Sequence, residues 1–223
     1  MLLSLGQTHR AEEVARSISD EETKRASTIV SLEARHELGT LRQLLQSHVR
    51  EVKSSAMPDW IMVEASSWIM AGFLQQTHDV LRDASPAEPL THMIQSQLAF
   101  AEGRYKDAVA AGLRSLRGQE KSGGNYQLKT AEVVAQAMRE LGDTDSAISL
   151  LEEYTAHRED SLAGVATRAD FWISARLRLA GLYRATGRQT DAERIETDAA
   201  KFLAVADRDH PLVLELKRRA HGS

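Results

Sequence analysis

Histidines and acidic residues are the first candidates for chemistry in this chain. The eight histidines include no HExxH motif and no pair three or four residues apart, the helical spacing that brings two imidazoles to one metal ion. Asp207, Asp209 and His210 lie close together in sequence and end at a proline. This string favours a helix end, an aspartate-rich turn and a new helix, with a zinc or magnesium site as the alternative. We expect no metal and no cofactor.

Other patterns that could support catalysis or nucleotide binding are weak. Adjacent acidic residues such as Glu12-Glu13 and Glu152-Glu153 are typical of the solvated face of an amphipathic helix. No serine lies in a glycine-rich nucleophile turn, and neither GxGxxG nor GxxxxGK[ST] occurs. Gly123-Gly124 is expected in a loop between helices. The sequence therefore predicts a protein that is not an enzyme.

The composition limits the class of protein further. The 28 basic and 32 acidic side chains give a net charge of -4, so a broad positive field for nucleic acid or anionic lipid is missing. The absence of cysteine excludes disulfides and thiolate metal sites and fits a reducing compartment. The most hydrophobic window, residues 60–74, contains Glu64 and is shorter than the roughly 20 residues of a membrane crossing. We predict a cytoplasmic protein with neither nucleic acid nor membrane as its partner.

The elements that must position any site are helices. Apolar residues recur three and four apart, as in Val134, Ala137, Met138 and Leu141, and no stretch alternates apolar and polar residues as a strand would. The four prolines fall between stretches rich in Ala, Leu, Glu, Gln and Arg, which favour helix. The sequence predicts an all-α chain.

Glycines recur near the ends of the expected helices, 31 to 45 residues apart. They are Gly6, Gly39, Gly72, Gly103, Gly142 and Gly187. A glycine is favoured where one helix ends and an antiparallel helix begins, because the left-handed backbone needed there costs little without a Cβ. Small and aromatic residues flank the last three, as Ala180, Tyr183 and Ala192 flank Gly187. The predicted repeat unit is a helical hairpin.

This spacing resembles the tetratricopeptide repeat (TPR), a helical hairpin of about 34 residues. The resemblance implies an all-α, right-handed superhelical solenoid of about five or six antiparallel hairpins over residues 1–223. A short capping helix is expected at about residues 211–220. The unit at Gly39 fits least, since Arg35 and Leu44 stand where an aromatic residue and an alanine are expected.

In this family the first helix of each hairpin lines a concave groove that binds a peptide or helix of a partner. Carried over repeat by repeat, the groove residues are Met62, Ser66, Ile69, Met93, Gln97, Phe100, Gln136, Arg139, Arg178 and Arg184. Such a lining would suit a partner peptide with apolar anchors and an acidic end. The alternative is that Met62, Met93 and Phe100 are core between hairpins.

Chaperone binding is not expected. The positions that match the family's asparagine and lysine clamp for a chaperone carboxylate hold Met93, Gln97, Glu132 and Gln136.

We therefore expect a non-catalytic protein-interaction scaffold, the sensor or adaptor part of a larger regulatory or assembly protein. The alternatives are a small-ligand or peptide-sensing domain of a bacterial regulator and, less favoured by the negative charge, a helical-repeat RNA binder. Aligned on Gly6, the first hairpin lacks most of its first helix. We expect the chain to be cut from a longer protein, or this end to be covered by another subunit in a homo-oligomer.

Overall fold

The computed structural model describes residues 6–51, 59–82, 89–122, 126–156 and 169–221. Within these ranges the regular structure consists of twelve α-helices and one short 3₁₀ helix, with no strand. The predicted all-α class is therefore confirmed. None of the described helices is long and apolar enough to span a bilayer.

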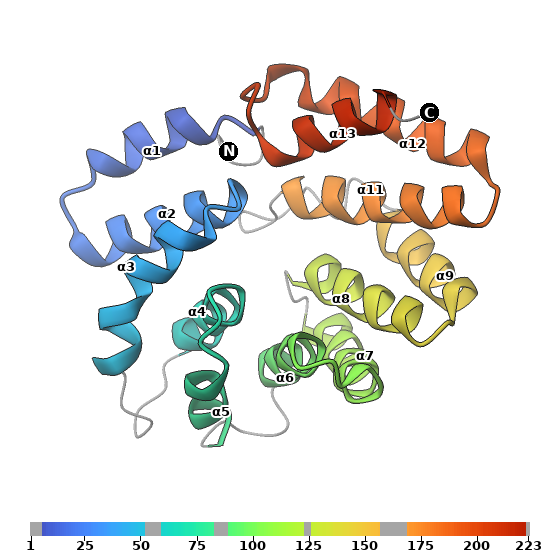
Figure 1. Ribbon diagram of the computed structural model, residues 1–223. Coiled ribbons are helices and arrows are strands. Elements are labelled where there is room, and N and C mark those ends of the chain that lie inside the picture. Colours follow the sequence, from blue (N-terminus) through green and yellow to red (C-terminus); the bar gives the residue numbers. More distant parts are fainter. Residues whose placement is uncertain (1–5, 52–58, 83–88, 123–125, 157–168, 222–223) are drawn as a thin grey trace. The chain divides into compact units, whose positions relative to one another are not determined.

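Contacts group the described residues into two compact units, and the prediction of a single domain over residues 1–223 stays a prediction. The first unit joins both ends of the chain, up to Leu41 and from α11 onward. It contains α1 (Thr8–Arg16), α2 (Glu21–Ala34), the start of α3 (Leu38–Glu51), α11 (Ala169–Ala185), α12 (Gln189–Phe202), η2 (Leu203–Val205) and α13 (Pro211–His221). The pairs α1–α2 and α11–α12 are its antiparallel hairpins (Figure 1).

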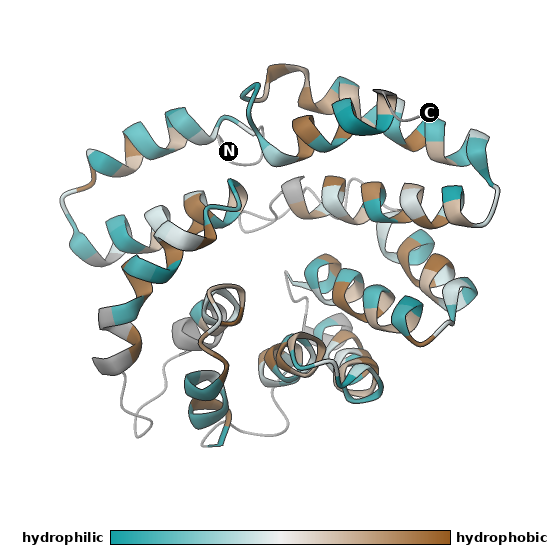
Figure 2. Cartoon of the chain, viewed as in Figure 1, coloured by the Kyte–Doolittle hydropathy of each residue, from teal (hydrophilic) through white to brown (hydrophobic). Residues whose placement is uncertain are grey.

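The second unit contains the rest of α3 and six further helices. They are α4 (Asp59–Met70), α5 (Leu74–Arg82), α6 (Pro89–Ala101), α7 (Tyr105–Ser122), α8 (Gln127–Glu140) and α9 (Thr144–Thr155). Helix α6 lies at the centre of this unit, because it packs against α4, α5, α7 and α8. Hydrophobic residues cover much of α6, whereas α1 of the first unit is mostly hydrophilic (Figure 2).

Five helix ends share one joint, and four of these joints connect helices that pack on each other as a hairpin. A residue with a left-handed backbone ends the first helix, and the next residue donates its N–H to the carbonyl five positions earlier, at 2.8 to 3.0 Å. The left-handed residues are His36 (φ 55°), Gly72 (φ 84°), Gly103 (φ 74°), Gly142 (φ 84°) and Gly187 (φ 80°). This is the Schellman arrangement, which satisfies the carbonyl groups left free at a helix end. Four of the six predicted glycine turns are thus observed as helix ends.

The structure has a turn near Gly39, but Gly39 is not its left-handed residue. Gly39 lies in the first turn of α3, and His36 takes the left-handed position three residues earlier. Histidine is among the residues that enter this backbone region more readily than most. A glycine is therefore not required, and the glycine pattern alone misplaced this joint.

Buried residues recur at fixed distances from these joints. The residue five positions after each joint has no exposed surface; these residues are Leu41, Thr77, Ala108, Ala147 and Ala192. Small residues also stand seven positions before four of the joints, at Ala65, Ser96, Ala135 and Ala180, and each is at most 1% exposed. Within one hairpin Ser96 donates to the carbonyl of Ala108 at 2.7 Å. These positions let the two helices of a hairpin approach closely.

The start of the described chain packs on its own C-terminal segment. Gly6 has the predicted left-handed backbone, with φ 70°. Its carbonyl accepts a hydrogen bond from the N–H of Asp207 at 3.0 Å, and a Cβ added at Gly6 would lie 2.6 Å from that of Ala206. Helix α13 begins at Pro211, as predicted for the cap, and packs against α12. The end that we expected to need another subunit is thus in contact with the same chain.

Candidate binding cleft between α5, α6 and α7

The apolar part of the predicted groove is largely inside the second unit. Met93 has no exposed surface, and Ser66 and Gln97 are 2% and 6% exposed. Phe100 is half-buried, contacts the ring of Tyr105 at 5.6 Å between centroids and packs on a small alanine cluster. Ile69 is half-buried, and the side chain of Met62 lies outside the described residues. Met93, Ser66 and Gln97 offer almost no surface to a partner in this structure.

The polar part of the predicted groove is spread over two units. Arg184 of α11 donates from Nε and Nη2 to the carboxylate of Glu196 at 3.1 and 2.6 Å. Arg139 forms an ion pair with its neighbour Glu140 at the end of α8. Gln136 and Arg178 are both half-buried, on α8 and α11 respectively. Arg139 and Arg184 therefore already hold a carboxylate of this chain.

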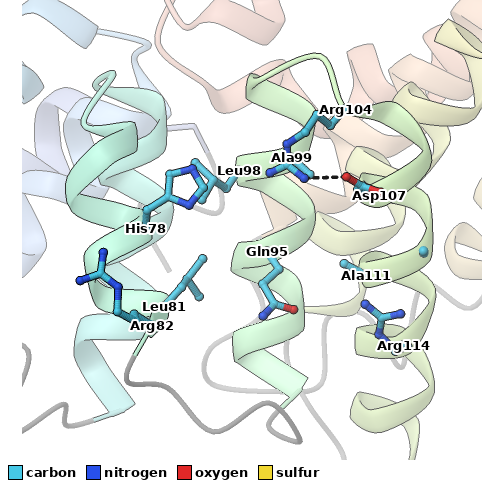
Figure 3. A pocket seen from close by; sticks show the side chains of 11 residues that line it. His78, Leu81, Arg82, Gln95, Leu98, Ala99, Arg104, Asp107, Ala111 and Arg114 are labelled. Atoms are coloured by element: carbon cyan, nitrogen blue, oxygen red, sulfur yellow. Dashed lines mark hydrogen bonds and ion pairs between the residues drawn. The ribbon is translucent and has the colours of Figure 1, made fainter.

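The second unit has a surface cleft of about 480 Å³ between α5, α6 and α7. Its lining consists of His78, Leu81, Arg82, Gln95, Leu98, Ala99, Arg104, Asp107, Ala110, Ala111 and Arg114 (Figure 3). No residue of the predicted groove lines this cleft. Clefts of about 300–1,000 Å³ are usual for ligand sites. We therefore take this cleft as the candidate site.

Helical spacing explains which residues face the cleft. On α7 the lining residues are Asp107, Ala110, Ala111 and Arg114, at offsets of three, four and seven residues along one helical face. Each of α5 and α6 contributes a triplet at offsets of three and four in the same way. The α6 triplet points away from the face that carries Met93 and Gln97, since 3.6 residues complete a turn. This periodicity was a signal in the sequence that the groove prediction did not use.

One end of the cleft is a closed network of charges. Glu102, at the end of α6, accepts hydrogen bonds from Arg104 at 2.6 and 3.0 Å and has His78 Nε2 at 2.6 Å. Arg104 also donates to Asp107 at 2.7 Å. Partial burial raises the pKa of Glu102, but the hydrogen bonds from Arg104 and His78 outweigh burial and hold this pKa below its usual range. The hydrogen bonds to Glu102 and Asp107 raise the pKa of Arg104. Arg104 is thus a cation fixed in place.

Further along the cleft the cations are free or loosely held. Arg114 of α7 has no hydrogen bond or ion pair among the residues that the structure describes. Arg82 pairs with Asp79 at 2.8 Å, but the two side chains are 70% and 50% exposed, and such surface pairs contribute little. The cleft lining therefore carries three arginines and one histidine against a single carboxylate.

The aspartates near the C-terminus form a link between chain ends. The structure places His9, not His210, beside Asp207 and Asp209, with one ligand atom of each within 4.8 Å of the others. These groups already bond within the chain: Asp207 accepts from the N–H of His9 and from Thr8 Oγ1, both at 2.9 Å. Asp209 lies 2.9 Å from His9 Nε2. The carboxylate of Asp207 thus caps the N-terminus of α1.

Comparisons with other proteins identify no relative of this chain. Models of protein families, curated proteins and solved structures all give no match. The class is therefore stated from the fold itself: an all-α protein that contains helical hairpins with a shared joint.

Proposed function

We propose that this chain is a non-catalytic, TPR-like module of stacked helical hairpins that binds a segment of a partner protein. The observation that carries the proposal is the shared joint, in which the left-handed residue, the closing hydrogen bond and the buried residue five positions later recur at five helix ends. Repeated hairpins build stacks whose extended surfaces usually serve binding. A sensor or adaptor in a regulatory or assembly process is the corresponding role.

A buried polar cluster at Gln119 supports a structural use of polar groups. Gln119 is 1% exposed and donates to Ser115 at 2.9 Å and to Thr130 at 3.1 Å. Its side-chain oxygen accepts from the N–H of Tyr126 at 3.0 Å. The bonds among Gln119, Ser115, Thr130 and Tyr126 join α7 to the start of α8. Satisfied networks of this type fix the position of helices.

The proposal places the partner in the cleft between α5, α6 and α7. A photoreactive benzoylphenylalanine at Ala110, which is exposed and lines the cleft, tests this placement in cells that naturally contain the protein. The same residue at Ala200, exposed on α12, is the control. We expect a discrete protein adduct from position 110 and none from position 200. The same adducts from both positions, or none from either, would contradict the proposal.

A small-ligand sensor is the second candidate, because the volume of about 480 Å³ also suits a small molecule. Thermal melting of the protein with a panel of nucleotides and small carboxylic acids tests this alternative. A compound that raises the melting temperature of the wild type, but not of Arg114→Gln, would favour the sensor. A panel without any shift would leave the protein partner as the stronger proposal.

A further inference from the structure

We propose that the cleft binds an acidic segment of the partner, with Arg114 as the anchoring cation and the apolar floor taking a neighbouring apolar side chain. This inference rests on the proposed function, since it names the chemistry of the partner segment. The sequence predicted that the acidic end of the partner would meet Arg139 and Arg184, but these arginines already hold Glu140 and Glu196. We therefore place the acidic residues of the partner at Arg114.

Arg114 carries the argument because it is the lining arginine without a partner in the described structure. It lies on the cleft face of α7, one turn after the small residues Ala110 and Ala111 that also line the cleft. Figure 3 shows Ala111 and Arg114 on this helix. A guanidinium group offers two parallel N–H donors, which match the two oxygens of a carboxylate. An incoming carboxylate would therefore gain hydrogen bonds without displacing an existing ion pair.

The ion pair of Arg104 shows that the cleft already accommodates a carboxylate, that of Asp107. Arg104 Nη1 donates to the carboxylate of Asp107, which lines the same cleft, at 2.7 Å. Asp107 is 64% exposed on its side chain, so this pair is open to solvent and to competition by an outside carboxylate. Asp107 thus acts as an internal competitor of the ligand and repels its charge.

The floor of the cleft is apolar, so the partner segment should also carry apolar side chains. Leu98 and Ala99 of α6 and Ala111 of α7 are 2%, 2% and 4% exposed and form part of the lining. Leu81 of α5 is half-buried on the same cleft. A partner segment that alternates acidic and apolar residues would cover this floor while its carboxylates reach the arginines.

A protein segment fits the charge distribution better than a nucleic acid does. Nucleic-acid affinity depends on several phosphates, each neutralised by a lysine or arginine. The cleft has one arginine that is unpaired among the described residues, and the whole chain has a net charge of -4, which repels a long polyanion. A short acidic segment needs one strong contact only.

The test measures binding of two fluorescent hexapeptides to the full chain, one of alternating glutamate and leucine and one of alternating glutamine and leucine. The variants are Arg114→Gln, Asp107→Asn and the control Arg117→Gln, an exposed arginine of α7 that does not line the cleft. We expect the glutamate peptide alone to bind. Arg114→Gln should weaken its binding about tenfold, Asp107→Asn should strengthen it, and Arg117→Gln should change it less than about twofold.

Three results would overturn the inference. They are equal binding of the two peptides, equal loss in Arg114→Gln and Arg117→Gln, and displacement of the glutamate peptide by oligouridylate at equal concentration. A cross-linked partner at position 110 together with any of these results would leave the proposed function standing. Absence of the cross-link alone would contradict the proposed function. The peptide measurement would then still show whether the cleft binds an acidic segment.

Discussion

Arg184 and Arg219 in the first unit and Arg114 in the α5–α7 cleft use the same side chain in opposite ways. In the first unit, Glu196 of α12 accepts hydrogen bonds from both Arg184 of α11 and Arg219 of α13. Arg219 also pairs with Glu215 within α13. In the second unit, Arg114 lacks any such acceptor among the described residues. The first set of cations connects helices, whereas Arg114 is the cation that we propose for a ligand.

Burial explains why the first set must be paired. The side chains of Glu196, Arg184 and Arg219 are 12%, 26% and 21% exposed, so each has lost much of its water. A charge that loses its water is costly unless another group replaces the hydrogen bonds. Burial raises the pKa of Glu196, but the hydrogen bonds from Arg184 and Arg219 outweigh burial and lower this pKa. A sequence shows the number of charges, but it does not show which of them meet.

The largest expected effect follows from breaking the paired set. Glu196→Gln keeps the shape of the side chain but takes the Glu196 carboxylate away from Arg184 and from Arg219, which keeps its ion pair with Glu215. We expect it to lower the free energy of unfolding by about 2–4 kcal/mol, measured by urea denaturation. The control is Glu193→Gln, an exposed residue on the same helix, with an expected change below about 0.5 kcal/mol. Equal effects of the two variants would show that the pairing does not stabilise the first unit.

The second unit depends instead on close helix contacts. A Cβ added at Gly112 of α7 would lie 2.1 Å from Val134 Cγ2 and 2.8 Å from Ser96 Oγ. Valine in a helix has one strongly preferred rotamer, and Ser96 is bonded to Ala108, so neither side chain moves easily. In Gly112→Ala the cost of overpacking should exceed the gain in helix propensity. We expect the free energy of unfolding, measured by urea denaturation, to fall by about 1 kcal/mol. An increase in stability would mean that α7 and α8 can separate at no cost.

The sequence was sufficient to predict the helical class, most hairpin joints and the helix that begins at Pro211, because glycine and apolar periodicity are local signals. It was not sufficient for the joint at His36, where a residue other than glycine takes the left-handed backbone. Nor did it predict the cleft, because the prediction chose another face of α6 and treated every arginine as available. The pairing of Arg184 with Glu196 depends on how α11 and α12 pack, which no single stretch of sequence contains.

Substitutions near the joint at His36 are expected to change stability less than the preceding variants, and to raise it. Gly39 is helical and nothing lies within 4 Å of an added Cβ, so Gly39→Ala should raise the free energy of unfolding by about 0.5–1 kcal/mol. His36→Gly should also stabilise, because glycine takes φ 55° without steric cost. The matched control is Gly142→Ala, at a joint with φ 84°, which should destabilise. Loss of stability in Gly39→Ala would indicate that Gly39, and not His36, has the left-handed backbone at this turn.

The smallest expected effect concerns the link between the chain ends. The hydrogen bond and the charge of Asp209 raise the pKa of His9 above 6.5, and the charge of Asp207 adds a smaller increase. Slight burial and the charge of Arg35 oppose this increase. The link therefore stabilises the first unit below pH 6.5 and loses this contribution as the pH rises through the pKa of the folded protein. The hydrogen bond from His9 also lowers the pKa of Asp209, so protonation of Asp209 removes the link only in acid, below pH 3.8.

His9→Asn tests this link by removing the titrating group while keeping a polar side chain. In the wild type the urea midpoint should fall between about pH 6 and about pH 9 by more than it falls in His9→Asn. Asp209→Asn should show the same reduced pH dependence, because it removes the other half of the pair. The effect is small because the side chains of His9 and Asp209 are 53% and 65% exposed and water screens their attraction. An unchanged pH dependence in both variants would mean that Asp207, through its cap on α1, holds the two ends together without the help of His9 protonation.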